Sequence, residues 1–260
     1  MNNVQLIAEI TQIARQAGAT ILEIYSQEAD FQVEHKADSS PLTIADRRAN
    51  EIICSALEGL PLQYPIISEE NQQIPYAERQ YFTKAWLVDP LDGTKEFLKR
   101  NGDFTVNIAL INEGVIELGV VYIPVFDEMY YATKGGGAFK EKNGMVQRLQ
   151  ALPFSMTDTG LKVISSRSHM NPETEAFIQQ LDQPELVSRG SSLKFLLIAL
   201  GQAQVYPRMA PTMEWDTGAA QIILEEAGGQ VIDQNTNAPL RYNKENLLNP
   251  YFVAYGDLKR

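Results

Sequence analysis

The chain has 260 residues, 44% of them hydrophobic and 21% charged, which allows a large buried core and argues against long disordered tails. Its 33 acidic and 22 basic residues give a formal net charge of −11, which argues against nonspecific binding to nucleic acid or anionic lipid. No apolar run reaches the length of a membrane span, and the first residues lack the features of a signal peptide.

The first part of the chain is predicted to be helical and then rich in strands. Apolar residues recur at helical spacing over residues 4–26, and a second helix is expected to end near Leu57. Asn112-Glu113-Gly114 lies between two alternating segments, which is typical of a hairpin. Gly135-Gly136-Gly137 lacks the Gly-Lys-Ser/Thr ending of a phosphate loop and is interpreted as a turn. The strands of this antiparallel meander are expected at residues 106–111, 115–121, 129–133, 138–140 and 145–148.

The composition changes near residues 152–160, where proline and polar residues interrupt the pattern. We therefore predict a division into an α+β half, residues 1–152, and an α/β half, residues 153–260. Asn171-Pro172-Glu173 has the cap, first-position proline and first-turn acid of a helix start. Ser191-Ser192 is expected to open another helix, which closes at Gly201. The remaining elements are expected at residues 161–165 (strand), 205–206 (strand), 216–227 (helix), 231–232 (strand) and 252–253 (strand).

One apolar strand ends in the hexapeptide Asp89-Pro90-Leu91-Asp92-Gly93-Thr94. Hard cations such as Mg²⁺ prefer oxygen ligands, which the two carboxylates and the Leu91 carbonyl can supply. The N–H groups of Gly93 and Thr94 can face an anion. Asp-Pro and Asp-Gly are also common in ordinary turns, but the complete pattern directly after an apolar strand favours a metal and phosphate site.

The hexapeptide resembles the signature of the inositol monophosphatase-like family of Mg²⁺-dependent, lithium-sensitive phosphatases. Three further segments are similar to motifs of that family: the Lys36–Asp46 loop, the strand end at Glu69, and Trp215-Asp216 before a run of small residues. The local alternatives are first-turn acids for Asp46 and Asp216 and a solvated strand end for Glu69. The resemblance implies the layered αβαβα sandwich of the sugar phosphatases, with an α+β first half and an α/β second half. It also implies a set of metal ligands: Glu69, Asp89, the Leu91 carbonyl, Asp92 and Asp216.

The implied site holds two or three Mg²⁺ ions, with Mn²⁺ as a substitute, and oxygen-only ligands fit this choice over zinc. By the resemblance Asp46 helps to bind an additional metal, and we count it with Glu69 and Thr94 as catalytic. We infer that Glu69 and Thr94 orient the attacking water, while the metal near Asp216 stabilises the leaving oxygen. Thr94 is equally a candidate phosphate ligand.

The second half contains segments that resemble the 3′(2′),5′-bisphosphate nucleotidase branch of the family, of the bacterial CysQ type. These are residues 165–169, 189–194, 201–208 and 211–212. The resemblance implies hydrolysis of 3′-phosphoadenosine 5′-phosphate to AMP and phosphate in sulfur assimilation. The substrate-binding residues that it implies are Gly93, Thr94, Ser166, His169, Ser191, Lys194, Arg208 and Asp216, with Ser166 and His169 on the nucleotide and Ser191, Lys194 and Arg208 on its 5′-phosphate or ribose side.

Two alternatives stay open from the sequence. An inositol or sugar monophosphatase would use the same metal site without a nucleotide, and a noncatalytic nucleotide-binding sensor would keep the fold. The complete carboxylate set argues against the sensor, because a sensor needs no water-activating centre. The single Cys54 cannot form an intrachain disulfide, so a cytoplasmic setting is expected, and the resemblance adds peripheral association with the inner membrane. The sequence leaves the oligomeric state open.

Overall fold

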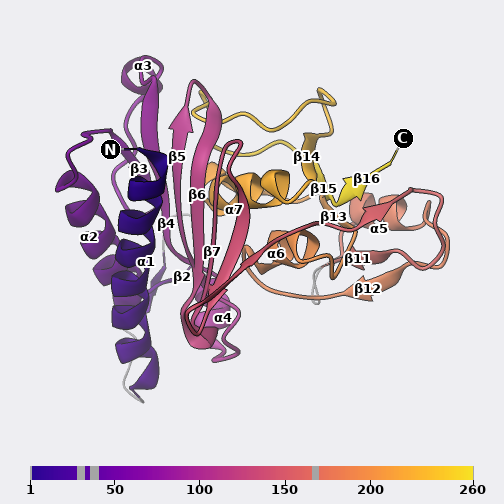
Figure 1. Ribbon diagram of the computed structural model, residues 1–260, viewed down its shortest axis with the longest axis horizontal. Coiled ribbons are helices and arrows are strands. Elements are labelled where there is room, and N and C mark those ends of the chain that lie inside the picture. The colour runs from indigo at the N-terminus through magenta and orange to yellow at the C-terminus, as the bar shows by residue number, and fades with distance from the viewer. Residues whose placement is uncertain (1, 28–32, 36–40, 166–169, 260) are drawn as a thin grey trace.

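The computed structural model describes residues 2–27, 33–35, 41–165 and 170–259. Five layers lie across the molecule in the order helix, sheet, helix, sheet, helix (Figure 1), as predicted for the αβαβα sandwich. The first layer is α1 (Asn3–Ser26) and α2 (Ile44–Glu58), the middle layer is α6 (Leu193–Ala199) and α7 (Glu214–Glu226), and the last is α5 (Pro172–Ile178).

The larger sheet of the described residues has seven strands. Its order is β3 (Ile66–Ser68), β4 (Lys84–Asp92), β5 (Thr105–Asn112), β6 (Val115–Ile123), β7 (Glu128–Thr133), β8 (Gly137–Lys142) and β9 (Met145–Arg148). Only β3 runs parallel to its neighbour, and the other pairs form the predicted antiparallel meander. Glu113 and Gly114 connect β5 to β6 with φ angles of 51° and 76°, the left-handed conformation that a two-residue hairpin turn needs.

The predicted turn at Gly135-Gly136-Gly137 is confirmed, and its N–H groups have an internal partner. The amides of Gly135 and Gly137 donate to the Glu226 carboxylate at 2.7 and 2.8 Å. The turn therefore binds an acidic side chain at the end of α7. The amide groups that a phosphate loop would offer to a phosphate are already used by Glu226.

The smaller sheet has the order β12 (Glu185–Val187), β11 (Lys162–Ile164), β13 (Val205–Arg208), β15 (Phe252–Tyr255) and β14 (Gln230–Asp233). The short elements outside the two large sheets are β1 (Glu34–His35), β2 (Pro41–Leu42), α3 (Tyr76–Arg79), α4 (Thr94–Leu98), η1 (Pro124–Phe126), β10 (Pro153–Phe154) and β16 (Asp257–Leu258). Of these, β1, β2, α3, β10 and β16, together with β12, were not expected from the sequence, because two- to four-residue segments carry too little periodicity.

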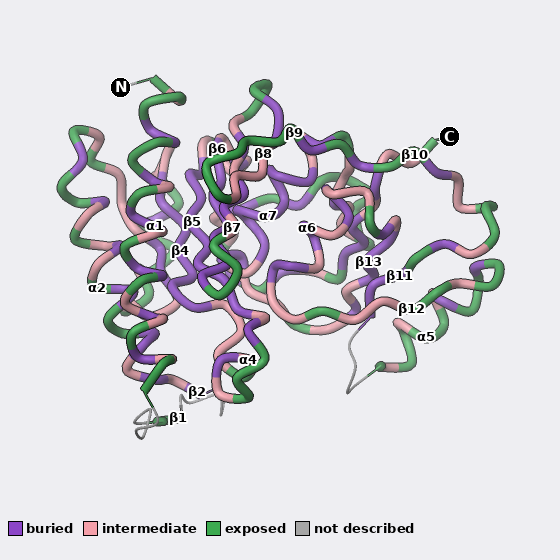
Figure 2. Tube along the Cα trace, turned by 60° about the horizontal axis from the view of Figure 1, so that its bottom comes forward, coloured by how far each residue is buried: buried purple, intermediate pink, exposed green. Residues whose placement is uncertain are grey.

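Three apolar clusters fill the spaces between the layers, and buried residues are concentrated in the central strands, whereas the edge strand β9 is exposed (Figure 2). One lies between the α1 and α2 pair and the seven-stranded sheet. A second continues from the other face of that sheet through α6 and α7 to the smaller sheet. This cluster contains residues from both sides of residue 152, so the two predicted halves share one apolar core. The division at residue 152 stays a prediction. Among the described residues no helix has the length and apolar character needed to cross a bilayer.

Helix α7 begins at Glu214, two residues before the predicted start. The Glu214 side chain is fully buried, and its carboxylate accepts hydrogen bonds from the amides of Asn243 and Lys244 at 2.6 and 3.1 Å. The Lys244 ammonium group forms an ion pair with the same carboxylate. A loop more than twenty residues downstream thereby holds the first turn of α7.

Substitution Glu214→Ala is expected to lower the free energy of unfolding by about 3–5 kcal/mol, the cost of breaking a buried ion pair and orphaning its donors. Urea unfolding without divalent cations measures the change. Lys259→Ala is the control, because it removes an ion pair whose lysine side chain is 60% exposed, worth about 1 kcal/mol or less. A loss for Glu214→Ala no larger than the control's would contradict this account.

Candidate active site

The end of β4 brings three acidic side chains from distant parts of the chain together. Glu69 follows β3, Asp89 lies in β4, and Asp216 lies in the first turn of α7. One carboxylate oxygen of each lies within 4.8 Å of those of the other two. The β3–β4 pairing places Glu69 beside Asp89, since the Glu69 amide donates to the Val88 carbonyl at 3.1 Å.

The acidic cluster carries charge that the surrounding protein leaves largely uncompensated. Asp89 is 1% exposed, and burial together with the charges of Glu69, Asp92 and Asp216 raises its pKa well above the usual range. Burial and then the charge of Asp92 raise the pKa of Asp216 to about 8. Such a group of carboxylates is stabilised by protons or by a bound cation. Oxygen ligands of this kind suit a hard divalent cation, so the residues fit a metal site.

Pro90 interrupts β4 and sets the local geometry of the hexapeptide. The β4–β5 register shifts between Asp89 and Asp92, and the Leu91 amide bonds to Asp89 Oδ1 at 3.1 Å. Gly93 has a φ of 96°, and a Cβ there would lie 3.0 Å from the Asp103 carbonyl oxygen. A left-handed, closely packed residue at this position requires glycine, which lets the chain turn from β4 directly into α4.

Thr94 and Asp46 form a pair beside the acidic cluster. Thr94 Oγ1 donates to Asp46 Oδ1 at 3.0 Å and lies 3.3 Å from the Leu91 carbonyl oxygen. Asp46 is 1% exposed and accepts a hydrogen bond from the Thr43 amide at 2.7 Å. Burial raises the pKa of Asp46, against the effect of its hydrogen bonds from Thr43 and Thr94. Asp46 is therefore both the first-turn acid of α2 and a partner of Thr94.

Asp92 is held differently from the other acids. Its Oδ2 accepts hydrogen bonds from Ser191 Oγ at 2.6 Å, the Ser192 amide at 2.7 Å and Ser192 Oγ at 2.9 Å. These donors lie just before α6, in the second half of the chain. Asp92 thus faces Asp216 while the loop before α6 holds one of its oxygens.

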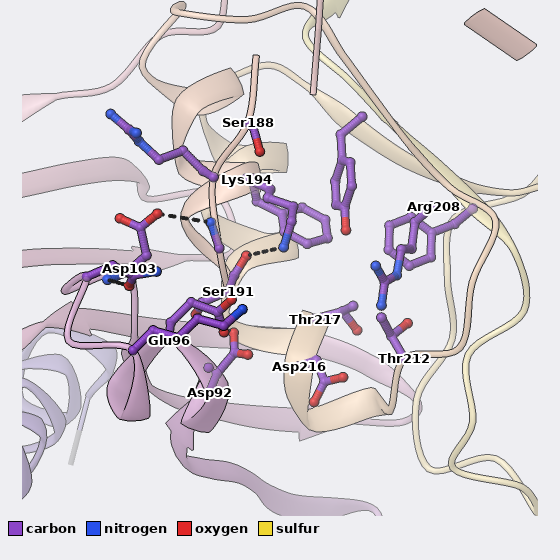
Figure 3. Close-up of a pocket in the computed structure, with 18 residues that line it drawn as sticks. Asp92, Glu96, Asp103, Ser188, Ser191, Lys194, Arg208, Thr212, Asp216 and Thr217 are labelled. Carbon is purple, nitrogen blue, oxygen red and sulfur yellow. Dashed lines mark hydrogen bonds between the residues drawn. The ribbon is translucent and has the colours of Figure 1, made fainter. Parts of the chain in front are cut away.

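A cavity of about 360 Å³ lies next to the acids, between the end of β4 and the second half. Figure 3 shows Asp92 and Asp216 on one side of it, with Lys194 and Arg208 extending from other elements. Lys194 Nζ donates to the Ser191 carbonyl at 3.1 Å and lies over the Tyr206 ring. The basic residues that line this cavity are Lys99, Arg189, Lys194 and Arg208, and the aromatic ones are Phe195, Tyr206 and Phe252.

A second, smaller cavity of about 330 Å³ contains the acidic cluster itself. It is lined by Glu69, Asp89, the Leu91 residue and Thr94, and it shares Asp92, Gly93, Glu96 and Asp216 with the first cavity. The predicted metal ligands therefore line a cavity that is adjacent to the predicted substrate space.

The structure brings together most of the residues predicted from the sequence. Ser191, Lys194, Arg208, Gly93 and Asp216 all line the larger cavity. Ser166, His169 and residues 36–40 of the Lys36–Asp46 loop lie outside the described residues. Residues that the sequence interpretation missed include Lys99, Asn101, Asn107 and Ser192; of these, Asn107 had a signal, because it is a polar residue inside an apolar strand.

These features define a layered α/β protein with an acidic cluster that could hold a metal ion, beside a cavity lined by charged and aromatic side chains. The model of the inositol monophosphatase family matches residues 2–254, and the chain belongs to that family.

Relatives extend over almost the whole chain. The 3′(2′),5′-bisphosphate nucleotidase CysQ of Escherichia coli is 44% identical over 248 residues, which cover 95% of this chain and 98% of that protein. The CysQ nucleotidase of Haemophilus influenzae is 34% identical over 98% of this chain and 94% of its own. The crystal structure of CysQ from Bacteroides thetaiotaomicron has a TM-score of 0.83 and 44% identity, with 97% of both chains covered. An IMPase structure from Thermotoga maritima, 22% identical with a TM-score of 0.79 over 97% and 92% of the chains, supports the fold alone.

Proposed function

We propose that this protein is a 3′(2′),5′-bisphosphate nucleotidase that hydrolyses 3′-phosphoadenosine 5′-phosphate to AMP and phosphate in sulfur assimilation. The observation that carries the proposal is that the two cavities are adjacent and share Asp92, Gly93, Glu96 and Asp216 as lining residues. The acidic cluster borders a space whose other walls carry Lys194 and Arg208, so one end suits chemistry on a phosphate and the other a second anion. The identity of 44% to relatives named as nucleotidases supports the same substrate.

The cavity lining favours a nucleotide over an inositol monophosphate. A monophosphate brings one anionic group, which the metal end would bind, and needs no further cations. The cavity is lined by four acidic residues, Asp92, Glu96, Asp103 and Asp216, and by four basic ones, Lys99, Arg189, Lys194 and Arg208. With Asp92 and Asp216 engaged by the proposed cations, the basic residues outnumber the remaining acids and can bind a second anion. The rings of Phe195, Tyr206 and Phe252 add an apolar wall suited to a base or ribose.

The proposed cofactor is Mg²⁺, in two or three copies with Mn²⁺ as a substitute, held by Glu69, Asp89, the Leu91 carbonyl, Asp92 and Asp216. When bound, these cations supply positive charge that polarises the phosphate and stabilises the leaving oxygen. Thr94 Oγ1 is placed to take a proton from the attacking water and to pass its own proton to Asp46 Oδ1, 3.0 Å away. The water oxygen then bonds to phosphorus as the bond from phosphorus to the 3′ oxygen breaks. The leaving 3′ oxygen takes a proton from solvent water, and the hydroxide so formed is neutralised when Asp46 gives up the proton that it received.

Lys194→Ala is expected to lower kcat/KM for 3′-phosphoadenosine 5′-phosphate by about 5- to 150-fold, the effect of losing one hydrogen bond to a charged group. Adenosine 3′-monophosphate lacks the 5′-phosphate, so its kcat/KM is expected to stay within about twofold. Steady-state phosphate release with both substrates makes the comparison. An equal loss with both would place Lys194 away from the 5′-phosphate.

The test of the function is phosphate release with Mg²⁺ from a panel of substrates. We expect 3′-phosphoadenosine 5′-phosphate to have the highest kcat/KM, above inositol 1-phosphate and adenosine 3′-monophosphate. If inositol 1-phosphate were the much better substrate, the protein would be a monophosphatase on the same metal site. We also propose a cytoplasmic location, because the single Cys54 cannot form an intrachain disulfide.

A further inference from the structure

We propose that Ser192 and Asn107 are positioning residues that fix Asp92 for its cation. The inference rests on the proposed metal site and adds a role for two residues that neither touch the substrate nor ligate a metal. It starts from the unequal surroundings of the two Asp92 oxygens.

Oδ2 of Asp92 is saturated by donors from the protein. Three hydrogen bonds of 2.6 to 2.9 Å reach it from Ser191 and Ser192, and Asn107 Nδ2 lies at 3.4 Å. Within the part of the chain that the structure describes, Oδ1 has no hydrogen-bond partner. Asp92 can therefore offer a cation only one oxygen without breaking protein contacts, which explains why it stands apart from the Glu69, Asp89 and Asp216 group.

Ser192 is the point at which three elements meet. Its side chain is 1% exposed, and its Oγ lies 2.9 Å from Asp92 Oδ2 at the end of β4 and 3.0 Å from the Asp216 carbonyl oxygen in α7. The third neighbour is Asn107 of β5, whose Nδ2 donates to Ser192 Oγ at 3.0 Å. One hydroxyl thereby contacts the backbone or side chain of two proposed ligands that come from opposite halves of the chain.

Asn107 determines the direction in which the Ser192 hydroxyl points. Asn107 is 1% exposed, and its Oδ1 accepts a hydrogen bond from Thr105 Oγ1 at 2.9 Å. That contact leaves Nδ2, a donor, facing Ser192. Because the Ser192 oxygen accepts from Asn107, its single proton points away from Asn107, toward Asp92 Oδ2 at 2.9 Å and the Asp216 carbonyl oxygen at 3.0 Å, which share it.

Hydrogen bonds from residues that do not themselves touch the metal hold a carboxylate ligand in one orientation, and their loss typically weakens metal binding by about 10- to 100-fold. We expect that loss in Ser192→Ala for the cation that uses Asp92. The cation held by Glu69 and Asp89 should keep its affinity, because the Ser192 hydroxyl bonds to Asp92 and to the Asp216 backbone. Asn107→Ala should produce a smaller loss of the same kind.

Mn²⁺ titration of the full-length protein, followed by the electron paramagnetic resonance signal of free Mn²⁺, tests the proposal. Asp92→Asn first identifies the class of site that depends on Asp92. Ser192→Ala should then weaken that class by about 10- to 100-fold and leave the other unchanged. The Ser192→Ala, Asn107→Ala double variant should lose less than the sum of the two single losses, because Asn107 acts mainly through the Ser192 hydroxyl and its own contact with Asp92 Oδ2 is long, 3.4 Å. Tyr130→Phe is the matched control, because it removes a buried hydrogen bond, to Glu128 at 2.7 Å, away from the site.

Two results would overturn the proposal. One is unchanged Mn²⁺ binding in both Ser192→Ala and Asn107→Ala. The other is an equal weakening of all classes in step with a lower melting temperature of the metal-free protein, which would make the two residues merely structural. Wild-type protein that binds no Mn²⁺ would overturn the proposed metal site as well, whereas normal wild-type binding with unchanged variants removes the positioning role alone.

Discussion

Substitution Asp89→Asn is expected to lower kcat by roughly 10²- to 10³-fold or more, the range seen when a central electrostatic group is lost. Asp89 is the most enclosed member of the acidic cluster, with Glu69, Asp92 and Asp216 around it. Asparagine keeps the size of the side chain but removes its charge, and a proposed metal ligand is lost. Phosphate release from 3′-phosphoadenosine 5′-phosphate at saturating Mg²⁺ measures the effect.

The same substitution should leave the metal-free protein at least as stable as the wild type. Burial and three neighbouring negative charges disfavour the Asp89 carboxylate, so removing its charge relieves repulsion in the folded state. Urea unfolding in the presence of a chelator tests this, with Asp257→Asn on the surface as the control. Turnover close to that of the wild type would rule out the proposed site, and a strong loss of stability would make the kinetic result uninformative about metal binding.

The second large effect is expected at Thr94. Thr94→Ala should lower kcat by about 10²- to 10⁴-fold, the usual contribution of a positioned proton-transfer group, while KM changes little. The physical reason is the hydrogen bond from Thr94 Oγ1 to the buried Asp46 carboxylate. Pre-steady-state and steady-state phosphate release separate the chemical step from product release.

Thr94→Ser is the matched control, because serine keeps the hydroxyl and loses only a methyl group. It should stay within about tenfold of the wild type, and Asp46→Asn combined with Thr94→Ala should be scarcely worse than Thr94→Ala, since groups that act as a unit are not additive. A serine variant as slow as the alanine variant would assign Thr94 a packing role. Full additivity of the two substitutions would separate Thr94 from Asp46.

Local patterns in the sequence determined the elements that are long or strongly capped. The apolar stripe of α1 was predicted to within one residue, because a helix of 24 residues repeats its period many times. Asn171 caps α5 through the Thr174 amide, as its position before Pro172 predicted. The hairpin at Glu113-Gly114 was likewise predicted, since its left-handed backbone favours such residues.

The hexapeptide identified the metal site because its ligands are adjacent in the chain. Asp89, the Leu91 carbonyl, Asp92 and Thr94 lie within six residues, so one strand end and one turn suffice to place them. Family resemblance added Glu69 and Asp216 from distant segments. In the structure the carboxylates of Glu69, Asp89 and Asp216 lie close together, as the predicted ligand set requires.

Only the tertiary structure decided which polar residues support those ligands. Asn107 and Ser192 lie 15 and 100 residues after Asp92 in the chain. Their contacts depend on how β5, the loop before α6 and the end of β4 pack against one another. The same holds for Glu214, which bonds to a loop about thirty residues away. A single serine or asparagine has no periodic or capping signal, because its hydrogen-bond partner is set by packing between layers. Sequence therefore determined where the ligands are, and the folded chain determined what holds them in place.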